Sequence, residues 1–393
     1  MGDLMDVAAF ADAARAEADA WDRAGRLPGD IVKAMAAGGL LGADLPRDYG
    51  GAAASARELG EACARLGGVC SALRGLVTVQ GMVASALLRW GTGEQRTAWL
   101  PALAAGDRLA GFAATEEGAG SDLGALTTSV RAHGTGYAVT GRKLWVTFGT
   151  IADVFLVIGR TEDRTAAGGA GEEGAGEPDG GHGRTAALLV ESDRPGVTVE
   201  PVGEPFGMRA AGLAHVTFDE VRVPASHLVA PPGFGLSHVA AAAIDHGRHT
   251  VAWGCTGLAE ACLTYAARHT ARRTQGGVRL ADHQAVRAVL GRAQVAAAGA
   301  RQLCGHAADL RDRRSPEALA ETVVAKYAAA SAAASVSQDT FQLHGSAACG
   351  PDSAVGRLFR DARIMQIIEG SREVAEVLIG DLVLRRGGPG TAS

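Results

Sequence analysis

The chain changes character at Leu109-Ala110-Gly111-Phe112-Ala113-Ala114-Thr115-Glu116-Glu117-Gly118-Ala119-Gly120-Ser121-Asp122. The first half of this stretch is apolar and typical of a strand, and the second half is a glycine-rich loop. Such a loop approaches a ligand closely and offers it free backbone N–H groups. No helical pattern follows Gly120, so the stretch is not a Rossmann fingerprint. Taken alone, a turn with two glycines is a simpler interpretation than a cofactor loop.

The residues before this stretch have the period of helices. Apolar residues and alanines recur at every third or fourth position in 7–21, 31–41, 56–66 and 95–103. Between them, residues 71–90 are apolar nearly all round, which predicts a buried helix. We therefore expect an N-terminal helical domain over residues 1–108.

The residues after the stretch 109–122 have the pattern of strands. Segments rich in β-branched and aromatic residues occupy 137–147 (on both sides of a glycine turn), 154–159, 186–190, 197–202 and 216–223. They predict a small antiparallel β domain over residues 109–230. Residues 161–184 interrupt it with Gly, Ala, Glu and Asp and almost nothing apolar, so we expect a flexible hairpin tip there.

The helical period returns after Pro231-Pro232-Gly233 and continues to the end. Long alanine-rich segments cover 236–268, 280–311 and 316–343. They predict a closely packed C-terminal bundle over residues 231–393, and their length favours oligomerisation. We expect residues 387–393 to be disordered. The resulting order of helices, β domain and helices is an α+β fold.

Composition narrows the classes of partner. The net charge is -5 and the pI is about 6.1, which gives no reason to expect nucleic acid or an anionic membrane. We see no apolar run long enough to span a bilayer, and the acidic N-terminus lacks a signal-peptide pattern. Six scattered cysteines without C-x-x-C indicate reduced thiols in a cytoplasmic protein. No set of metal ligands is predicted.

One acid stands out near the end of the chain. Glu369 follows the apolar run 365–368 and directly precedes Gly370. A poorly solvated carboxylate has a raised pKa, which suits a general base. The simpler interpretation is an acid in front of the next helix, where Ser371 and Glu373 also suit a first turn. This stretch alone favours the simpler interpretation.

A second stretch, Lys143-Leu144-Trp145-Val146-Thr147, closes a predicted strand. Trp145 offers a flat apolar face and Thr147 a hydroxyl, a combination that suits an aromatic heterocycle. A core tryptophan beside a surface threonine explains the same pattern more simply.

Five motifs, in this order, together resemble the acyl-CoA dehydrogenase family. They lie at 115–122, at 145–147, at 218–224, at 273–275 with 282–284, and at 360–363 with 368–370. The resemblance covers nearly the whole chain. It implies the family's fold: an N-terminal helical domain, a central antiparallel β domain and a C-terminal four-helix-bundle domain. It also implies FAD, a homotetramer, an electron acceptor, and α,β-dehydrogenation of an acyl thioester.

The same resemblance implies roles for single residues. Glu369 falls at the position of the catalytic base. Residues implied for FAD are Phe112, Ala114, Thr115, Gly120, Ser121, Trp145, Val146, Thr147, Gln342, Leu343, Gly345, Ser371 and Glu373. Residues implied to reach the FAD of a neighbouring subunit are Arg273, Thr274, Gln275, His283 and Gln284. Residues implied for the substrate are Ser121, Asp245, Arg248 and Gly370.

Some relatives carry the base on another helix, just before an arginine. Here that arginine resembles Arg248, and the residue before it is Gly247, which holds no proton. This favours Glu369 as the base. Asp245 and His246 are close enough in sequence to support the site, although a helix-surface role is the simpler interpretation for both.

Residues 69–82 and 247–255, together with the stretch around Glu369, resemble dehydrogenases of polyketide gene clusters that make the methoxymalonyl extender unit. This implies a small hydroxyacyl substrate, of glyceryl or hydroxymalonyl type, on an acyl carrier protein. The alternatives are an ordinary short- or branched-chain acyl-CoA dehydrogenase and a flavin monooxygenase of the same fold, against which Glu369 argues. A nucleic-acid-associated flavin protein is disfavoured by the acidic charge balance.

Overall fold

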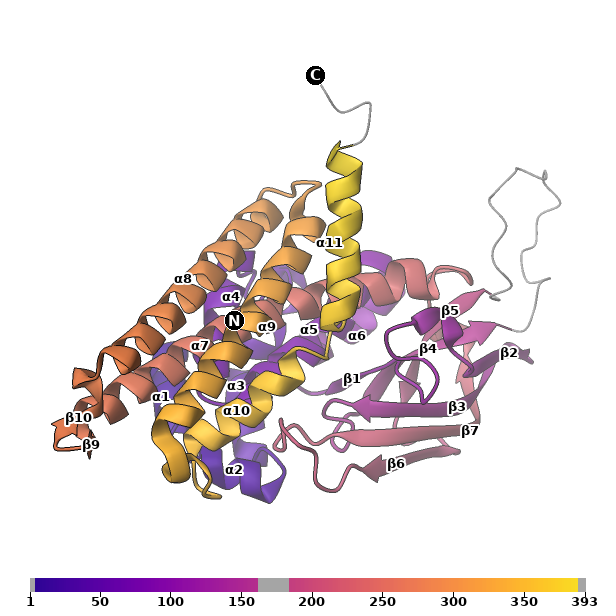
Figure 1. Ribbon diagram of the computed structural model, residues 1–393. Coiled ribbons are helices and arrows are strands. Elements are labelled where there is room, and N and C mark those ends of the chain that lie inside the picture. The colour runs from indigo at the N-terminus through magenta and orange to yellow at the C-terminus, as the bar shows by residue number, and fades with distance from the viewer. Residues whose placement is uncertain (1–3, 162–183, 388–393) are drawn as a thin grey trace.

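A computed structural model describes residues 4–161 and 184–387 of the chain. The N- and C-terminal helices pack together, and the strands form a separate sheet at their side (Figure 1). The predicted order of helices, sheet and helices is therefore confirmed. Apart from Thr161, Arg184 and Gly387 at their ends, the expected hairpin tip and C-terminal tail lie outside the described residues.

Within the described residues, six α-helices precede the sheet: α1 Val7–Ala14, α2 Ala18–Ala24, α3 Gly29–Ala37, α4 Ala56–Gly67, α5 Ser71–Trp90 and α6 Gly93–Ala105. Capping boxes at Ser55 with Glu58 and at Thr92 with Gln95 explain where α4 and α6 begin. The single helix expected over 7–21 is wrong, because the chain breaks it into α1 and α2. Similarly, α3 ends early at Ala37, and two residues later Gly39 has a φ of 75°, which favours glycine.

The helix α5 is the buried centre of the helical part, as its apolar pattern predicts. Most of its residues from Ser71 to Leu87 are buried. By length and composition it could cross a membrane, with a mean hydropathy of 1.3, so the expectation that no run is long enough needs correction. However, 89% of its most apolar window is buried inside the protein, as in a soluble core helix.

The sheet holds eight strands: β1 Ala110–Ala113, β2 Ser129–His133, β3 Gly136–Val146, β4 Val154–Thr161, β5 Thr185–Glu191, β6 Val197–Pro201, β7 Ala214–Pro224 and β8 Leu228–Val229. Their order is β6-β7-β3-β2-β4-β5-β8, and β1 pairs with β4. The sheet is mostly antiparallel, but β1 and β2 both run parallel to β4. The expected glycine turn at Gly141 is wrong, because β3 passes through it as one strand with a register shift.

As far as the structure describes the chain, five α-helices follow the sheet: α7 Ala241–Arg272, α8 Gln284–Asp312, α9 Ala318–His344, α10 Ala354–Met365 and α11 Arg372–Gly387. A short hairpin of β9 Thr274–Gln275 and β10 Val278–Arg279 joins α7 to α8, at the end farthest from the sheet (Figure 1). The helices α7, α8 and α9 pack on one another, and α7 also packs on α4 and α5.

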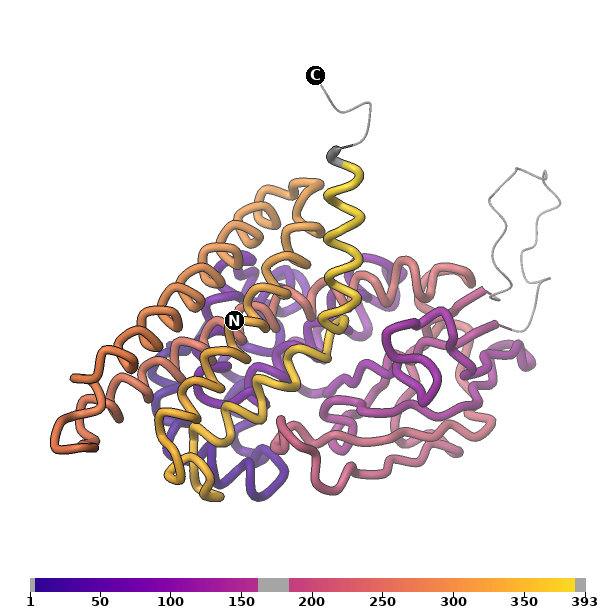
Figure 2. The backbone as a smooth tube through the Cα atoms, in the orientation of Figure 1, coloured from indigo at the N-terminus to yellow at the C-terminus, as the bar shows by residue number. Residues whose placement is uncertain are grey.

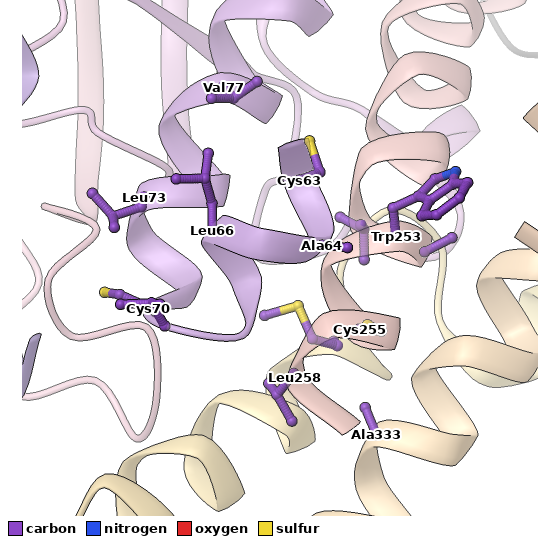
Figure 3. Close-up of a cluster of buried hydrophobic side chains, with 14 of the residues drawn as sticks. Cys63, Ala64, Leu66, Cys70, Leu73, Val77, Trp253, Cys255, Leu258 and Ala333 are labelled. Carbon is purple, nitrogen blue, oxygen red and sulfur yellow. The ribbon is translucent and has the colours of Figure 1, made fainter. Parts of the chain in front are cut away.

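Small residues explain how closely α7 approaches its neighbours. A Cβ at Gly257 would lie 1.8 Å from the Ala64 carbonyl oxygen, and one at Gly254 would lie 3.0 Å from Arg74 Cδ. Around this contact, side chains of α4, α5 and α7 fill the largest core, including Leu66, Leu73 and Cys255 (Figure 3). The core cysteines are free thiols, and burial raises the pKa of Cys63 to about 12, so this thiol is inert.

Candidate active site

The chain turns sharply between α10 and α11 (Figure 2). Glu369 lies in this bend, because α10 ends at Met365 and α11 begins at Arg372. Both Glu369 (φ 54°) and Gly370 (φ 91°) have left-handed backbones, which a glutamate adopts only when its surroundings enforce it. Two cations do so here. Arg248 of α7 donates from Nε to the Glu369 carbonyl at 3.1 Å. Buried Lys326 of α9 donates to the Gly370 carbonyl at 2.6 Å.

Glu369 is half-buried as a residue, and its carboxyl group lies against α7. A Cβ built on Gly247 would come within 2.6 Å of Glu369 Oε2 and 3.1 Å of the Met82 sulfur on α5. The carboxylate therefore occupies space that any other residue at 247 would fill. Residue 247, the alternative position for a base, therefore lies directly against the Glu369 carboxylate.

The surroundings of Glu369 tune its acidity. Burial raises the pKa of this carboxyl group, and the positive charges of Lys326, Arg248 and Arg74 oppose that effect without cancelling it. Burial also lowers the pKa of the Lys326 ammonium to about 8. A carboxylate with a raised pKa takes up a proton more readily, which is what a general base requires.

The glycine-rich loop is fastened to β3 by a buried ion pair. Lys143 Nζ lies 2.7 Å from Glu116 Oε1 and donates to the Ala114 carbonyl at 3.1 Å. Glu116 also accepts the backbone N–H groups of Thr127 and Thr128 at 2.7 and 3.0 Å. These bonds hold the pKa of Glu116 at about 2, against the effect of burial.

The bonds between Lys143 and the loop place Thr115 beside Trp145. The Leu144 N–H donates to the Thr115 carbonyl at 2.8 Å, so the loop and the end of β3 form one surface. Trp145 has a φ of 60° and is 52% exposed, with its ring edge-on to His215 at 5.4 Å. A Cβ at Gly118 or Gly120 would meet nothing within 4 Å, so the loop is open. An exposed indole next to an open glycine loop fits the flat ring system of a flavin.

The segment that follows Trp145 connects this surface to the helices. A Cβ at Gly75 of α5 would lie 3.0 Å from Met208 Cε and 3.7 Å from Phe148 Cε2. The Met208 N–H donates to Asp361 Oδ1 of α10 at 2.7 Å. The Trp145 surface and the helix that leads into Glu369 are thereby brought together where the sheet meets the helical layer.

Other residues implied for FAD lie apart from this junction within one chain. Exposed Arg273, Gln275 and Gln284 sit at the β9–β10 end, far from the sheet (Figure 1). Gln342, Leu343 and Gly345 lie where α9 ends. Ser371 and Glu373 are at the start of α11, next to the Glu369 bend. The roles of these residues stay predictions.

Asp245 and His246 do not lie on the helix surface, which corrects the simpler interpretation of both. Asp245 is buried and accepts a hydrogen bond from Arg311 of α8 at 2.8 Å, so its carboxylate is already engaged. His246 is also buried, and its Nδ1 lies 3.4 Å from Asp44 Oδ2. Its Nε2 has no hydrogen-bond partner among the described residues.

Sequence reasoning assigned no role to Arg74, Glu116, Lys143 or Lys326. A signal for the two lysines was present, because the chain contains only three lysines among many arginines. Two of the three, Lys143 and Lys326, are buried. Arg74 was visible as one of two charged residues in the apolar helix α5, and as the one in its buried part.

Comparison with known proteins agrees with this architecture. Residues 5–107, 111–221 and 235–384 match the N-terminal, middle and C-terminal domains of acyl-CoA dehydrogenase. The chain is 32% identical over 369 residues to an acyl-CoA dehydrogenase of Bacillus subtilis (strain 168), covering 93% of each chain.

Two solved structures are also similar. One is FkbI, for biosynthesis of the methoxymalonyl extender unit of the Fk520 polyketide immunosuppressant, with 37% identity, a TM-score of 0.86, and coverage of 97% of this chain and 99% of FkbI. The other is a glutaryl-CoA dehydrogenase from Mycobacterium smegmatis in complex with FADH2, with 26% identity, a TM-score of 0.86, and coverage of 97% and 93%. Matches to all three domains, taken with the geometry around Glu369 and Trp145, place the chain in the acyl-CoA dehydrogenase family of FAD-dependent oxidoreductases that act on CH–CH bonds.

Proposed function

We propose that the protein oxidises the α,β-carbons of a small acyl thioester carried by an acyl carrier protein, a hydroxyacyl precursor of a polyketide extender unit. The observation that carries this proposal is the 37% identity to FkbI over nearly the full length of both chains. The identity to the Bacillus subtilis acyl-CoA dehydrogenase is lower, at 32%.

In the reaction we propose, Glu369 removes the α-proton of the thioester. Its raised pKa makes it a stronger base than an exposed carboxylate. Arg248 and Lys326 hold the backbone of the bend, so the carboxylate keeps one position against Gly247. Bound FAD would accept the β-hydrogen as hydride. Thr115 and Trp145 would hold the flavin ring, and the open loop around Gly120 would offer it N–H donors.

The proposal includes a homo-oligomer, such as a tetramer. Arg273, Gln275 and Gln284 are exposed at the end of the long α7–α8 pair, where the sheet of the same chain is out of reach. A neighbouring copy could bring its FAD to these residues. An external electron acceptor would then reoxidise the flavin after each turnover.

The test is to identify the product made from matched thioesters. The FAD-loaded enzyme is incubated with a three-carbon hydroxyacyl group on a carrier protein, and separately with the same group on CoA. Mass spectrometry of each thioester should show the loss of two hydrogens, and flavin bleaching should be faster with the carrier protein.

Glu369→Gln serves as the control, because it keeps the shape of the side chain without a proton acceptor. Faster bleaching by butyryl-CoA or a longer acyl-CoA than by any carrier-protein thioester would contradict the proposal. It would indicate an ordinary short- or branched-chain acyl-CoA dehydrogenase instead.

A further inference from the structure

His246 is a buried histidine with one unpaired nitrogen. It precedes Gly247 on α7, and only 3% of the residue is exposed. Its Nδ1 lies 3.4 Å from Asp44 Oδ2, but its Nε2 has no hydrogen-bond partner among the described residues. His249 on the same helix is also buried, yet its Nε2 lies 2.8 Å from the Ala56 carbonyl oxygen. Since buried polar groups are normally hydrogen-bonded, the unpaired Nε2 of His246 points to a group supplied by a ligand.

Asp44 decides which nitrogen of His246 carries the proton. Burial works to raise the pKa of Asp44, but the neighbouring His246 and the local backbone outweigh burial and lower it. The carboxyl group is therefore ionised at neutral pH, and an ionised carboxylate only accepts hydrogen bonds. The proton of the neutral imidazole thus lies on Nδ1, which leaves Nε2 as an acceptor. A hydroxyl group can donate to this nitrogen, whereas a carboxylate or a carbonyl oxygen cannot.

The unpaired Nε2 lies beside the base, on the seam between α5 and α7. A Cβ at Gly81 of α5 would lie 2.1 Å from Nε2, and Gly81 directly precedes Met82. A Cβ at Gly247 would lie 3.1 Å from the Met82 sulfur and 2.6 Å from Glu369 Oε2. Burial raises the pKa of Glu369, and the charge of His246 is among those that oppose this effect. The imidazole and the carboxylate are therefore within electrostatic reach of each other.

Two hydroxyl groups of the protein on this seam are already engaged. Thr78 Oγ1 donates to Thr250 Oγ1 at 2.9 Å. Thr250 Oγ1 in turn donates to the His246 carbonyl oxygen at 3.2 Å. A plain acyl chain bound beside Glu369 would leave Nε2 buried and unpaired, whereas a chain with a hydroxyl group near the reacting carbons would pair it.

We propose that His246 Nε2 accepts a hydrogen bond from a hydroxyl group on one of the two reacting carbons of the acyl chain. His246 is then the residue that selects hydroxyacyl thioesters over plain acyl thioesters, and Asp44 holds its imidazole in the accepting form. This inference rests on the proposed dehydrogenation of an acyl thioester at Glu369, but not on the identity of the carrier.

The test compares three-carbon CoA thioesters that differ in one hydroxyl group. Propionyl-CoA is compared with α-hydroxypropionyl-CoA and β-hydroxypropionyl-CoA on the FAD-loaded enzyme under anaerobic conditions. Stopped-flow traces of flavin reduction over a range of thioester concentrations give the dissociation constant and the limiting rate separately. A hydrogen bond to an acceptor that is already buried predicts about 5- to 100-fold tighter binding of at least one of the two hydroxy thioesters.

Four variants make the test specific. His246→Phe keeps a flat ring without an acceptor, so it should abolish the preference and leave the binding of propionyl-CoA nearly unchanged. Gly81→Ala should have the same effect, because its methyl group would displace the imidazole. The matched controls are His306→Phe, at an exposed histidine of α8, and Gly291→Ala, where a Cβ meets nothing within 4 Å. FAD content and melting temperature show that each variant is folded.

Two outcomes would overturn the inference. One is that the native enzyme binds propionyl-CoA at least as tightly as both hydroxy thioesters. The other is that His246→Phe weakens the binding of all three thioesters equally, or of none, because the imidazole then has no part in selecting the hydroxyl group. Failure of the proposed function looks different: carrier-protein thioesters would leave the flavin oxidised, whereas the preference among the CoA thioesters would persist and would still depend on His246.

Discussion

Gly247 and Glu369 share one space from opposite ends of the C-terminal region: a Cβ at residue 247 would lie 2.6 Å from Glu369 Oε2. Only a residue without a side chain lets the carboxylate rest against α7. The two positions that the resemblance suggests for a base therefore exclude one another here, since a side chain at 247 would displace the Glu369 carboxylate.

Gly247→Ala should disable the enzyme without unfolding it. The new methyl group would push the Glu369 carboxylate from its place, and misplacement of about 1 Å can lower a rate by about 100-fold. Stopped-flow measurement of flavin reduction tests this. Gly291→Ala is the matched control, because a Cβ there meets nothing within 4 Å on helix α8. A normal rate in Gly247→Ala would show that the carboxylate is not fixed by this contact.

Glu369→Gln should slow flavin reduction by about 10²- to 10⁴-fold while FAD stays bound, because general base catalysis contributes this much. In the native enzyme the rate should rise with pH as Glu369 loses its proton. Burial raises this pKa, so the rise should lie above the range of an exposed carboxyl group. The variant should lack this acidic limb. Nearly normal reduction by Glu369→Gln would mean that another residue is the base.

Lys326→Met should move the acidic limb of the pH–rate profile of flavin reduction to higher pH. The ammonium of Lys326 lowers the pKa of Glu369, so its removal raises that pKa further and more base is needed to ionise the carboxyl group. The pH dependence of flavin reduction measures the shift. Lys33→Met, at an exposed lysine, should leave the profile unchanged. A limb at the native position or at lower pH would contradict the assigned role of this charge.

Trp145→Ala should weaken FAD binding by at least about fivefold, since aromatic stacking contributes about 1 kcal/mol beyond simple burial. Fluorescence titration of the apoprotein with FAD measures this affinity. Trp90→Ala is the comparison, because Trp90 is also partly exposed but packs on Phe234 and His238 at the end of α5. Equal effects of the two substitutions would argue against a flavin surface at Trp145.

Glu116→Gln should destabilise the fold by about 3–5 kcal/mol, because it leaves the Lys143 ammonium buried without its carboxylate. Urea unfolding measures this free energy. Glu200→Gln, which breaks the exposed pair with Arg142, should change it by about 0–1 kcal/mol.

The effect of Glu116 should also depend on pH. Its pKa is held at about 2 in the folded protein, against a usual value of 4.5. Its contribution is therefore complete above pH 4.5 and is lost as the pH falls toward 2. The difference in the free energy of unfolding between the native protein and Glu116→Gln should become smaller over that interval. A difference that stays constant there would mean that Glu116 does not stabilise the fold through its charge.

Local patterns predicted most of the fold. The period of three and four residues located α4, α5 and the long helices α7, α8 and α9, because each buries a continuous apolar face. The break between α1 and α2 was missed because no glycine or proline marks it, whereas the end of α3 was missed although Gly38 and Gly39 mark it. The parallel pairing of β1 and β2 with β4 is a long-range choice that strand alternation does not encode.

The sequence alone singled out those candidate site residues whose immediate neighbours in the chain are unusual. Trp145 is one of only five tryptophans, and Glu369 is the one acid between an apolar run and a glycine, so both stood out in the sequence. The cations around them were missed, because Arg74 and Lys326 come from α5 and α9 and only folding brings them near the bend. Asp245 was misjudged as a surface residue, because its partner Arg311 is 66 residues away in the chain.

The burial of two of the three lysines has a practical consequence. Amine-reactive reagents modify accessible lysines, and within the described residues only Lys33 on α3 is exposed. Among the described lysines, a dye or cross-linker would therefore attach at Lys33 in preference to Lys143 and Lys326. Slow labelling of Lys326 would, in turn, report how often the bend between α10 and α11 opens.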